Sequence, residues 1–151
     1  MSNISTVYDR LIVVIAALFT SKMRISNPYD LANNADIVLK DAWGLKMAAA
    51  GTSEISLYPF HSEAREFSVV LCRKVHKLRE DADALDAPIK ALMEDVKALT
   101  CAMVNGSQLS IPNSVGKIDF ISSSGVEFTR TGKQDNISTE VKFRIDIMEA
   151  I

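Results

Sequence analysis

The chain has 151 residues, of which 48% are hydrophobic and 24% are charged. This is the length of about one domain with an ordinary globular composition, which excludes a disordered or low-complexity chain. Lys and Arg number 17 against 19 Asp and Glu, a net charge of −2, which argues against a protein that binds nucleic acid through a basic surface. The cysteines, Cys72 and Cys101, are too few for a disulfide framework, a CxxC motif or a four-cysteine zinc site. We expect a single domain over residues 1–151.

The first predicted element is a helix over Val7–Phe19, with Thr6 as its N-cap. Its apolar run, Leu11–Phe19, is nine residues long, whereas a membrane-spanning helix needs about 20. A secretory signal peptide is the competing interpretation, but the run lacks a basic start and a small-residue cleavage pattern. Apolar residues recur on one helical face, which favours a buried helix: Val7, Leu11, Val14, Ile15 and Leu18.

The next part of the chain is predicted to be mostly extended. A turn at Ser26–Asp30 contains Pro28, and one short helical turn follows at 30–34. Extended segments are then predicted at Ile37–Leu39 and around Trp43, Leu45 and Met47. The small residues 48–53 indicate a mobile loop or a weak strand end. Alternating apolar residues over Ala64–Val75 predict a half-buried strand.

A second helix is predicted to begin at Asp86 and Pro88 and to end near Asn105-Gly106. A loop over 106–116 follows. The chain then ends in predicted strands and loops: strands at Lys117–Ser122 and Val126–Thr129 around a tight turn at 123–125, a charged loop at 130–138, and a strand at Val141–Ile147. These elements predict an α+β fold, a single mostly antiparallel sheet covered by two main helices.

Catalytic and metal-binding patterns are not found in the sequence. The histidines, His61 and His76, form no HExxH motif, and the glycines form no phosphate-binding loop. His61-Ser62-Glu63 is interpreted as a polar loop after Pro59, because the members of a triad come from different elements. We therefore expect no enzymatic activity, no catalytic or metal-ligating residue and no cofactor.

The one unusual charge pattern is a block of cations followed by a block of anions. Its members are Arg73, Lys74, Lys77, Arg79, Glu80, Asp81, Asp83 and Asp86. One interpretation is a solvated connection whose acidic residues lie near a helix N-terminus. The other is a subunit contact, because a segment that carries both signs can pair across a head-to-tail interface. On the second interpretation the cations are exposed, and Arg130 and Lys133 of the charged loop are further candidate contacts.

Several local motifs occur in a characteristic order. After the opening helix come the turn Arg24–Tyr29, the stretch 36–45 with Trp43-Gly44-Leu45, and a final strand Phe143–Ile147. In this order the chain resembles tail-terminator and neck (head-to-tail joining) proteins of long-tailed bacteriophages over nearly its whole length. The Asn-Pro-Tyr turn and the Trp-Gly strand are the most specific pieces of the resemblance.

The resemblance implies a structural virion protein that forms a hexameric ring in the phage neck. Such rings terminate tail-tube polymerisation and join the tail to the head connector, with DNA passing through the lumen without specific binding. The implied partners are copies of this chain, the tail-tube protein and a head-side connector or stopper protein, with no membrane. The implied location is the neck of the virion, after assembly in the host cytoplasm. A mildly acidic chain suits a passage that must not bind DNA tightly.

Two other hypotheses compete with this one. A small oligomeric α+β module that binds a ligand or regulates another protein would need a concave apolar pocket with a few polar groups. A small hydrolase would need His61 or Cys72 as its reactive group.

Overall fold

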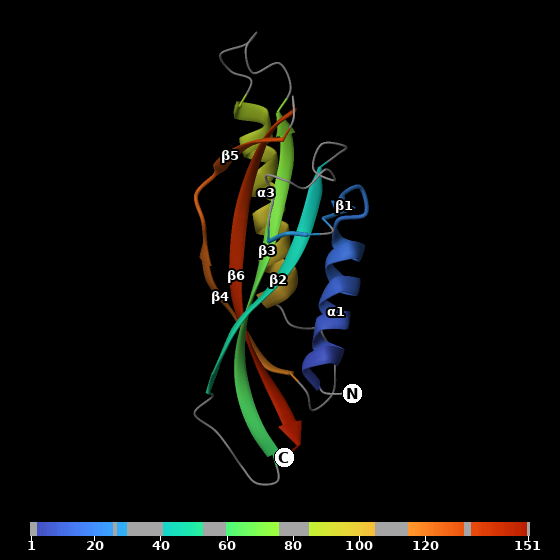
Figure 1. The fold of residues 1–151 in the computed structure, drawn as a ribbon, viewed down its shortest axis with the longest axis vertical. Helices are drawn as coiled ribbons and strands as arrows, with labels where there is room; N and C mark the ends of the chain where they lie inside the picture. Colours follow the sequence, from blue (N-terminus) through green and yellow to red (C-terminus); the bar gives the residue numbers. More distant parts are fainter. Residues whose placement is uncertain are drawn as a thin grey trace.

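The computed structural model describes residues 3–25, 27–29, 41–52, 60–75, 85–104, 115–131 and 134–150. Within these ranges, six strands form one sheet, and the helices α1 (Asn3–Leu18) and α3 (Asp86–Val104) pack against it (Figure 1). The strand pairs are antiparallel except for β1 with β2, which is parallel. The predicted α+β class, with one mostly antiparallel sheet and helices against it, is therefore confirmed.

The order of strands across the sheet is β1-β2-β3-β6-β4, and β5 also pairs with β6. Their bounds are β1 Met23–Arg24, β2 Ala42–Thr52, β3 Phe60–Val75, β4 Val115–Ser123, β5 Glu127–Thr131 and β6 Gln134–Ala150. The central strands, β3 and β6, have 16 and 17 residues and pair from Phe60 opposite Ala150 to Val75 opposite Asp135. Figure 1 shows this pair running along the long axis and extending beyond both helices near the C-terminus.

The main core lies between the sheet and the two helices. Alternate residues of the central strands point into it, and Phe67 of β3 stacks on Phe143 of β6 with ring centroids 5.3 Å apart. The helices contribute the apolar faces that the sequence predicted, including Leu11, Leu92 and Leu99. Because burial of apolar surface is the main favourable term in folding, this cluster holds both helices on the sheet.

A smaller apolar cluster lies on the opposite face of the sheet. Ile25, Ala42, Val70 and Cys72 are all buried there. The turn at 27–29 lies over this face, because a Cβ placed on Gly44 of β2 would be 2.6 Å from Cβ of Pro28. The lack of a side chain at Gly44 therefore permits the turn to pack directly on the strand.

The last strand is longer than predicted. Residues 134–138, predicted as part of a charged loop, form the first part of β6 and pair with both β3 and β5. Most of their side chains are polar, which hid the strand from a pattern based on apolar alternation, but Asn136 and Ser138 are buried and Ile137 lies in the main core. The loop prediction was wrong here because cross-strand pairing outweighs the polar composition.

The strands β4 and β5 do not pair with each other. Both pair with β6, one after the other, so the predicted tight turn at 123–125 is a short step along one sheet edge. Ser124 fixes this step, because its N–H donates to the Glu140 carbonyl at 2.8 Å and its Oγ accepts the Glu140 N–H at 2.9 Å. Thr139 Oγ1 also donates to the Ser124 carbonyl at 2.8 Å.

Other boundaries also differ from the predictions. Helix α1 includes Thr6, which is therefore not its N-cap, and β1 was not predicted. Residues 48–52 continue β2, so the interpretation of this segment as a strand end is confirmed and the interpretation as a mobile loop is wrong. His61, Ser62 and Glu63 belong to β3 and not to a polar loop. The predictions for 30–34, 37–39 and 106–114 lie outside the described residues.

We predict that Phe143→Ala lowers the free energy of unfolding by about 3–5 kcal/mol, because it removes a fully buried ring that stacks on Phe67. Val126→Ala, at a side chain that is 46% exposed, serves as the control and is expected to change it by less than about 0.5 kcal/mol. Urea unfolding followed by circular dichroism measures both. Equal losses for the two variants would contradict the assignment of Phe143 to the core.

Candidate interaction surfaces

The predicted contact residues are only partly within the described chain. Arg73 and Lys74 lie near the end of β3, and Arg130 lies in β5 opposite Asp135. The remaining candidates lie outside the described residues: Lys77, Arg79, Glu80, Asp81, Asp83 and Lys133. The proposal that these residues contact other subunits stays a prediction.

Arg73 forms an ion cluster with Lys22, Asp41 and Asp95. Its Nε and Nη2 each donate to a carboxylate oxygen of Asp95 at 2.8 Å, and its Nη1 donates to Asp41 Oδ2 at 3.0 Å. Lys22 Nζ lies 3.0 Å from Asp95 Oδ2, and the side chains of Lys22 and Asp95 are only 4% and 10% exposed. The cluster therefore joins the chain after α1, the residue before β2, strand β3 and helix α3.

Within the cluster, the guanidinium of Arg73 is held by the carboxylates of Asp95 and Asp41. Its hydrogen bond to Asp95, acting against the effect of burial, raises the pKa of Arg73 above its ordinary value. Arg73 was expected to be exposed, but its side chain is only 26% exposed, because its guanidinium is bound to carboxylates of the same chain. Lys74 differs in that its side chain is partly exposed, while its backbone N–H donates to Asp41 Oδ1 at 3.1 Å.

Cys72 lies in the smaller apolar cluster, where burial disfavours the thiolate form. Burial raises the pKa of its thiol to about 12, and the reactive form of a cysteine is the thiolate. His61 lies in β3 opposite Glu149 of β6. Among the described residues, His, Cys, Asp and Glu form no group that could hold a metal ion. The same ranges contain no helix with the length and hydropathy needed to cross a membrane.

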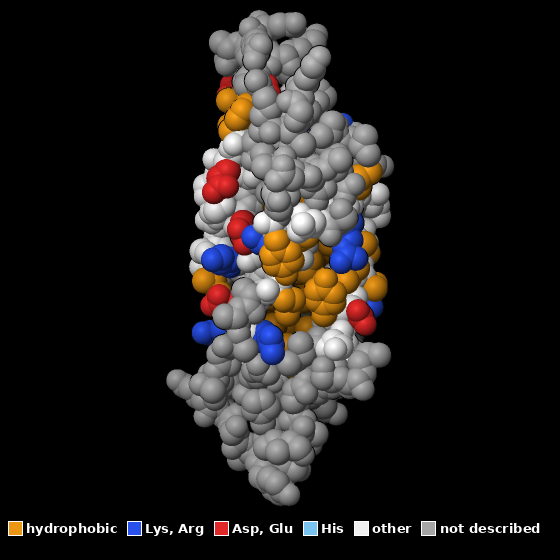
Figure 2. Space-filling model, in the orientation of Figure 1, with side chains coloured by type: hydrophobic (Ala, Val, Ile, Leu, Met, Phe, Trp, Pro, Cys, Tyr) orange, Lys and Arg blue, Asp and Glu red, His pale blue; other side chains and the backbone are white. Residues whose placement is uncertain are grey.

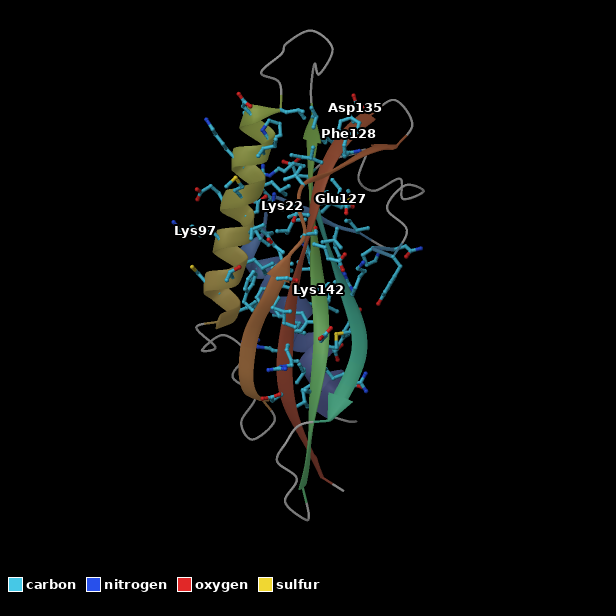
Figure 3. The ribbon with its side chains drawn as sticks, turned by 90° about the vertical axis from the view of Figure 1, so that its left-hand side faces the viewer. Lys22, Lys97, Glu127, Phe128, Asp135 and Lys142 are labelled. Atoms are coloured by element: carbon cyan, nitrogen blue, oxygen red, sulfur yellow. The ribbon has the colours of Figure 1, made fainter. Side chains whose placement is uncertain are left out.

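Four large exposed apolar side chains lie along the sheet edge formed by β4 and β5. We call this surface the edge patch, and its members are Phe120, Ile121, Val126 and Phe128, each between 42% and 50% exposed. Figure 3 views the molecule from this side, with Glu127 and Phe128 labelled. A protein that works alone rarely leaves large apolar groups together at an edge, so the patch is a candidate surface for a partner.

The pairing of β4 explains why the edge patch is exposed. Phe120 lies opposite Phe143 and meets its ring edge to face, with centroids 6.1 Å apart, but no strand follows on its outer side within the described chain. The register shifts between Phe120 and Ser122, which places Ile121 at an irregularity. The sequence predicted strands here but not their exposed position, because alternation does not reveal which strand is at an edge.

A further group of side chains lies on the opposite face of the sheet. The Tyr29 hydroxyl accepts the Met47 N–H at 3.2 Å, and Lys46 Nζ lies 6.0 Å from the centre of the Tyr29 ring. Lys46 Nζ is also 3.0 Å from Glu140 Oε1. Burial by itself would raise the pKa of Glu140, but hydrogen bonds from Lys46 and Ser68 and nearby cations together lower it. Figure 2 shows apolar side chains in the middle of this face with charged side chains of both signs around them.

Comparisons with known proteins find matches among the solved structures. No family model matches the chain, and no curated protein matches it. A chain of a solved structure, the virion of a native gene transfer agent particle, matches with a TM-score of 0.47 and 18% sequence identity. The match covers 95% of this chain and 92% of the other. Similarity at this level defines neither the function of the chain nor its oligomeric state.

We predict that Asp95→Asn lowers the free energy of unfolding by about 3–5 kcal/mol, because it leaves the buried Lys22 and the bidentate Arg73 without their shared carboxylate. Glu94→Gln, on the exposed side of the same helix, is the matched control and is expected to be neutral within about 0.5 kcal/mol. Chemical unfolding at pH 7 compares the two. A neutral Asp95→Asn would show that the ion cluster does not stabilise the fold.

We also predict that only one thiol reacts in the folded protein. Cys101 is exposed on α3, whereas Cys72 is buried and its pKa is raised to about 12. A thiol reagent at pH 8 should modify Cys101 quickly and Cys72 only after unfolding in urea. Mass spectrometry of peptides from the two samples identifies the modified residue. Rapid modification of Cys72 in the folded chain would revive the nucleophile hypothesis.

Proposed function

We propose that this chain is a structural virion protein that forms a hexameric ring in the neck of a long-tailed bacteriophage. In this proposal the ring ends the polymerisation of the tail tube and joins it to the head-side connector. DNA passes through the lumen without specific binding, and the chain has no catalytic role. The proposal rests on the resemblance of the sequence to tail-terminator and neck proteins, and two features of the structure support it.

The first feature carries the proposal, because it concerns the most specific pieces of that resemblance. The Asn27-Pro28-Tyr29 turn packs on the Trp43-Gly44 strand, with Pro28 directly over Gly44. The Ile25 N–H donates to the Trp43 carbonyl at 2.7 Å, and the Tyr29 hydroxyl accepts the Met47 N–H. Motifs that lie far apart in the sequence therefore form one structural unit, which makes their joint occurrence more than a coincidence of composition.

The second feature is the edge patch. Its exposed Phe, Ile and Val side chains favour a chain that is covered by another protein surface in its working state. A ring of identical subunits supplies such a cover to every copy at once. The net charge of −2 suits a ring around DNA, because few cations are present to neutralise phosphates.

The experiment that tests the proposal is native mass spectrometry of the purified chain, followed by negative-stain imaging. We predict a mass of six subunits and annular particles. The same protein, added to growing tail tubes, should shorten them and appear at one end of each tube. The comparison variant is Gly44→Ala, whose added Cβ would lie 2.6 Å from Cβ of Pro28 and which is therefore expected to displace the turn from β2 and to reduce capping.

Two results would count against the proposal. A chain that is monomeric at every concentration and also leaves tube length unchanged would overturn it. A thermal shift of several degrees with one small metabolite, without annular particles, would favour the ligand-binding module instead.

A further inference from the structure

We propose that the Tyr29 hydroxyl closes the edge of β2 that faces away from β3, and that this contact keeps a strand of a second copy from adding to the sheet there. This role belongs to a single subunit, so it goes beyond the proposed function and does not depend on it. The edge of β2 lies on the other side of the sheet from the edge patch.

Strand β1 covers only the beginning of this edge of β2. Met23 and Arg24 pair with Ala42 and Trp43, and the Ile25 N–H donates to the Trp43 carbonyl at 2.7 Å. Within the described ranges no other strand pairs with this edge (Figure 1). A free edge presents unpaired N–H and C=O groups and is therefore a template for the addition of another strand.

The uncovered part of the edge is short. Backbone groups of successive residues in a strand alternate between its two neighbours, and the carbonyls of Asp41 and Trp43 point toward β1. The next groups on this side are therefore those of Leu45 and Met47. The pairing register of β2 shifts after Met47, and an irregularity of this kind bends a strand and interrupts its pairing. The regular open edge thus consists of two residues, and Met47 is the second of them.

Tyr29 occupies the backbone donor of Met47. Its hydroxyl accepts the Met47 N–H at 3.2 Å. A hydroxyl satisfies this N–H as the carbonyl of a neighbouring strand would, but a single side chain offers no row of further donors and acceptors to the next strand. The contact therefore ends the pairing on this side of the sheet.

Local contacts direct Tyr29 to this position. The Tyr29 N–H donates to Asn27 Oδ1 at 3.2 Å, which closes a turn across Pro28. Pro28 packs on the strand itself, since a Cβ placed on Gly44 would lie 2.6 Å from Cβ of Pro28. The turn thus fixes the backbone of Tyr29 beside β2 before the hydroxyl makes its contact.

Lys46 and Glu140 hold the ring of Tyr29. The ring is 66% exposed, so burial contributes little to its position. Lys46 Nζ lies 6.0 Å from the ring centre, where a cation is attracted to an aromatic face, and 3.0 Å from Glu140 Oε1. A Lys on an edge strand ordinarily repels a second strand through its own charge. Here the charge is bound on the face of the sheet and acts on the edge through Tyr29.

Hydrogen exchange at single backbone amides, followed by NMR, tests the contact. Tyr29→Phe keeps the ring and removes the acceptor, so it should raise the exchange rate of the Met47 amide about tenfold. Lys46→Met removes the cation over the ring and should raise the same rate about threefold. The amides of Gly44 and Lys46 point toward β3 and should keep their wild-type rates in Tyr29→Phe.

Tyr8→Phe is the matched control, because the Tyr8 hydroxyl accepts from a side chain, that of Arg24, at 3.4 Å. It should leave the Met47 rate unchanged. An unchanged Met47 rate in Tyr29→Phe would overturn the contact. Equally faster exchange at Gly44, Lys46 and Met47 would show a general loosening of β2 and would also overturn it.

A second measurement tests the protective role. Sedimentation velocity and infrared spectroscopy compare wild type, Tyr29→Phe and Tyr8→Phe after incubation. Tyr29→Phe should form species larger than the wild-type protein, with new intermolecular β-sheet, whereas Tyr8→Phe should match wild type. In the larger species the Met47 amide should be protected again, because the added strand pairs with it.

The outcomes are distinct from those that test the neck ring. Faster exchange at Met47 without larger species would overturn the protective role. Larger species in which the Met47 amide still exchanges quickly would overturn β2 as the site of strand addition. The hexamer and the capping of tail tubes are measured on the wild-type chain, so either result leaves the test of the proposed function unaffected.

Discussion

The antiparallel pairing of β3 with β6 is the constraint on which the rest of the structure depends. The two strands are paired from Phe60 opposite Ala150 to Val75 opposite Asp135. One face of the pair receives both helices, and Phe67 and Phe143 stack at its centre. Because β6 is 17 residues long, it can pair with β4 and then with β5 on its other side. The exposed edge is therefore a direct result of the length of β6.

The ion cluster complements this pairing at the end of the sheet where β3 finishes. Arg73 lies on the face of the sheet that the helices cover, and Asp95 of α3 and Lys22 after α1 reach it there. Buried ion pairs add little net stability, but they penalise arrangements in which one partner is displaced. The cluster therefore determines where α3 lies relative to the chain that leaves α1, while the apolar core provides most of the favourable free energy of folding.

Much of the fold could be predicted from the sequence, because apolar periodicity reports which face of an element is buried. The helices around Leu11 and Leu92 and the strands around Phe67 and Phe143 were predicted in this way. Periodicity failed over 134–138, where most side chains are polar and pairing with β3 and β5 defines the strand. The charge block could not show which residues its members bind, because the partners of Arg73, Asp41 and Asp95, are distant in sequence. The edge patch could not be predicted, because only topology shows which strand is last.

The two faces of α1 differ in what they contact. The inner face is buried in the main core, and the outer face keeps Val13, Ala16 and Ala17 in solvent. A free subunit with this helix and an apolar sheet edge is exposed to uncontrolled pairing, which native proteins usually prevent with edge charges or a covering element. Glu127, which is exposed between Val126 and Phe128 on β5, places such a charge on this edge.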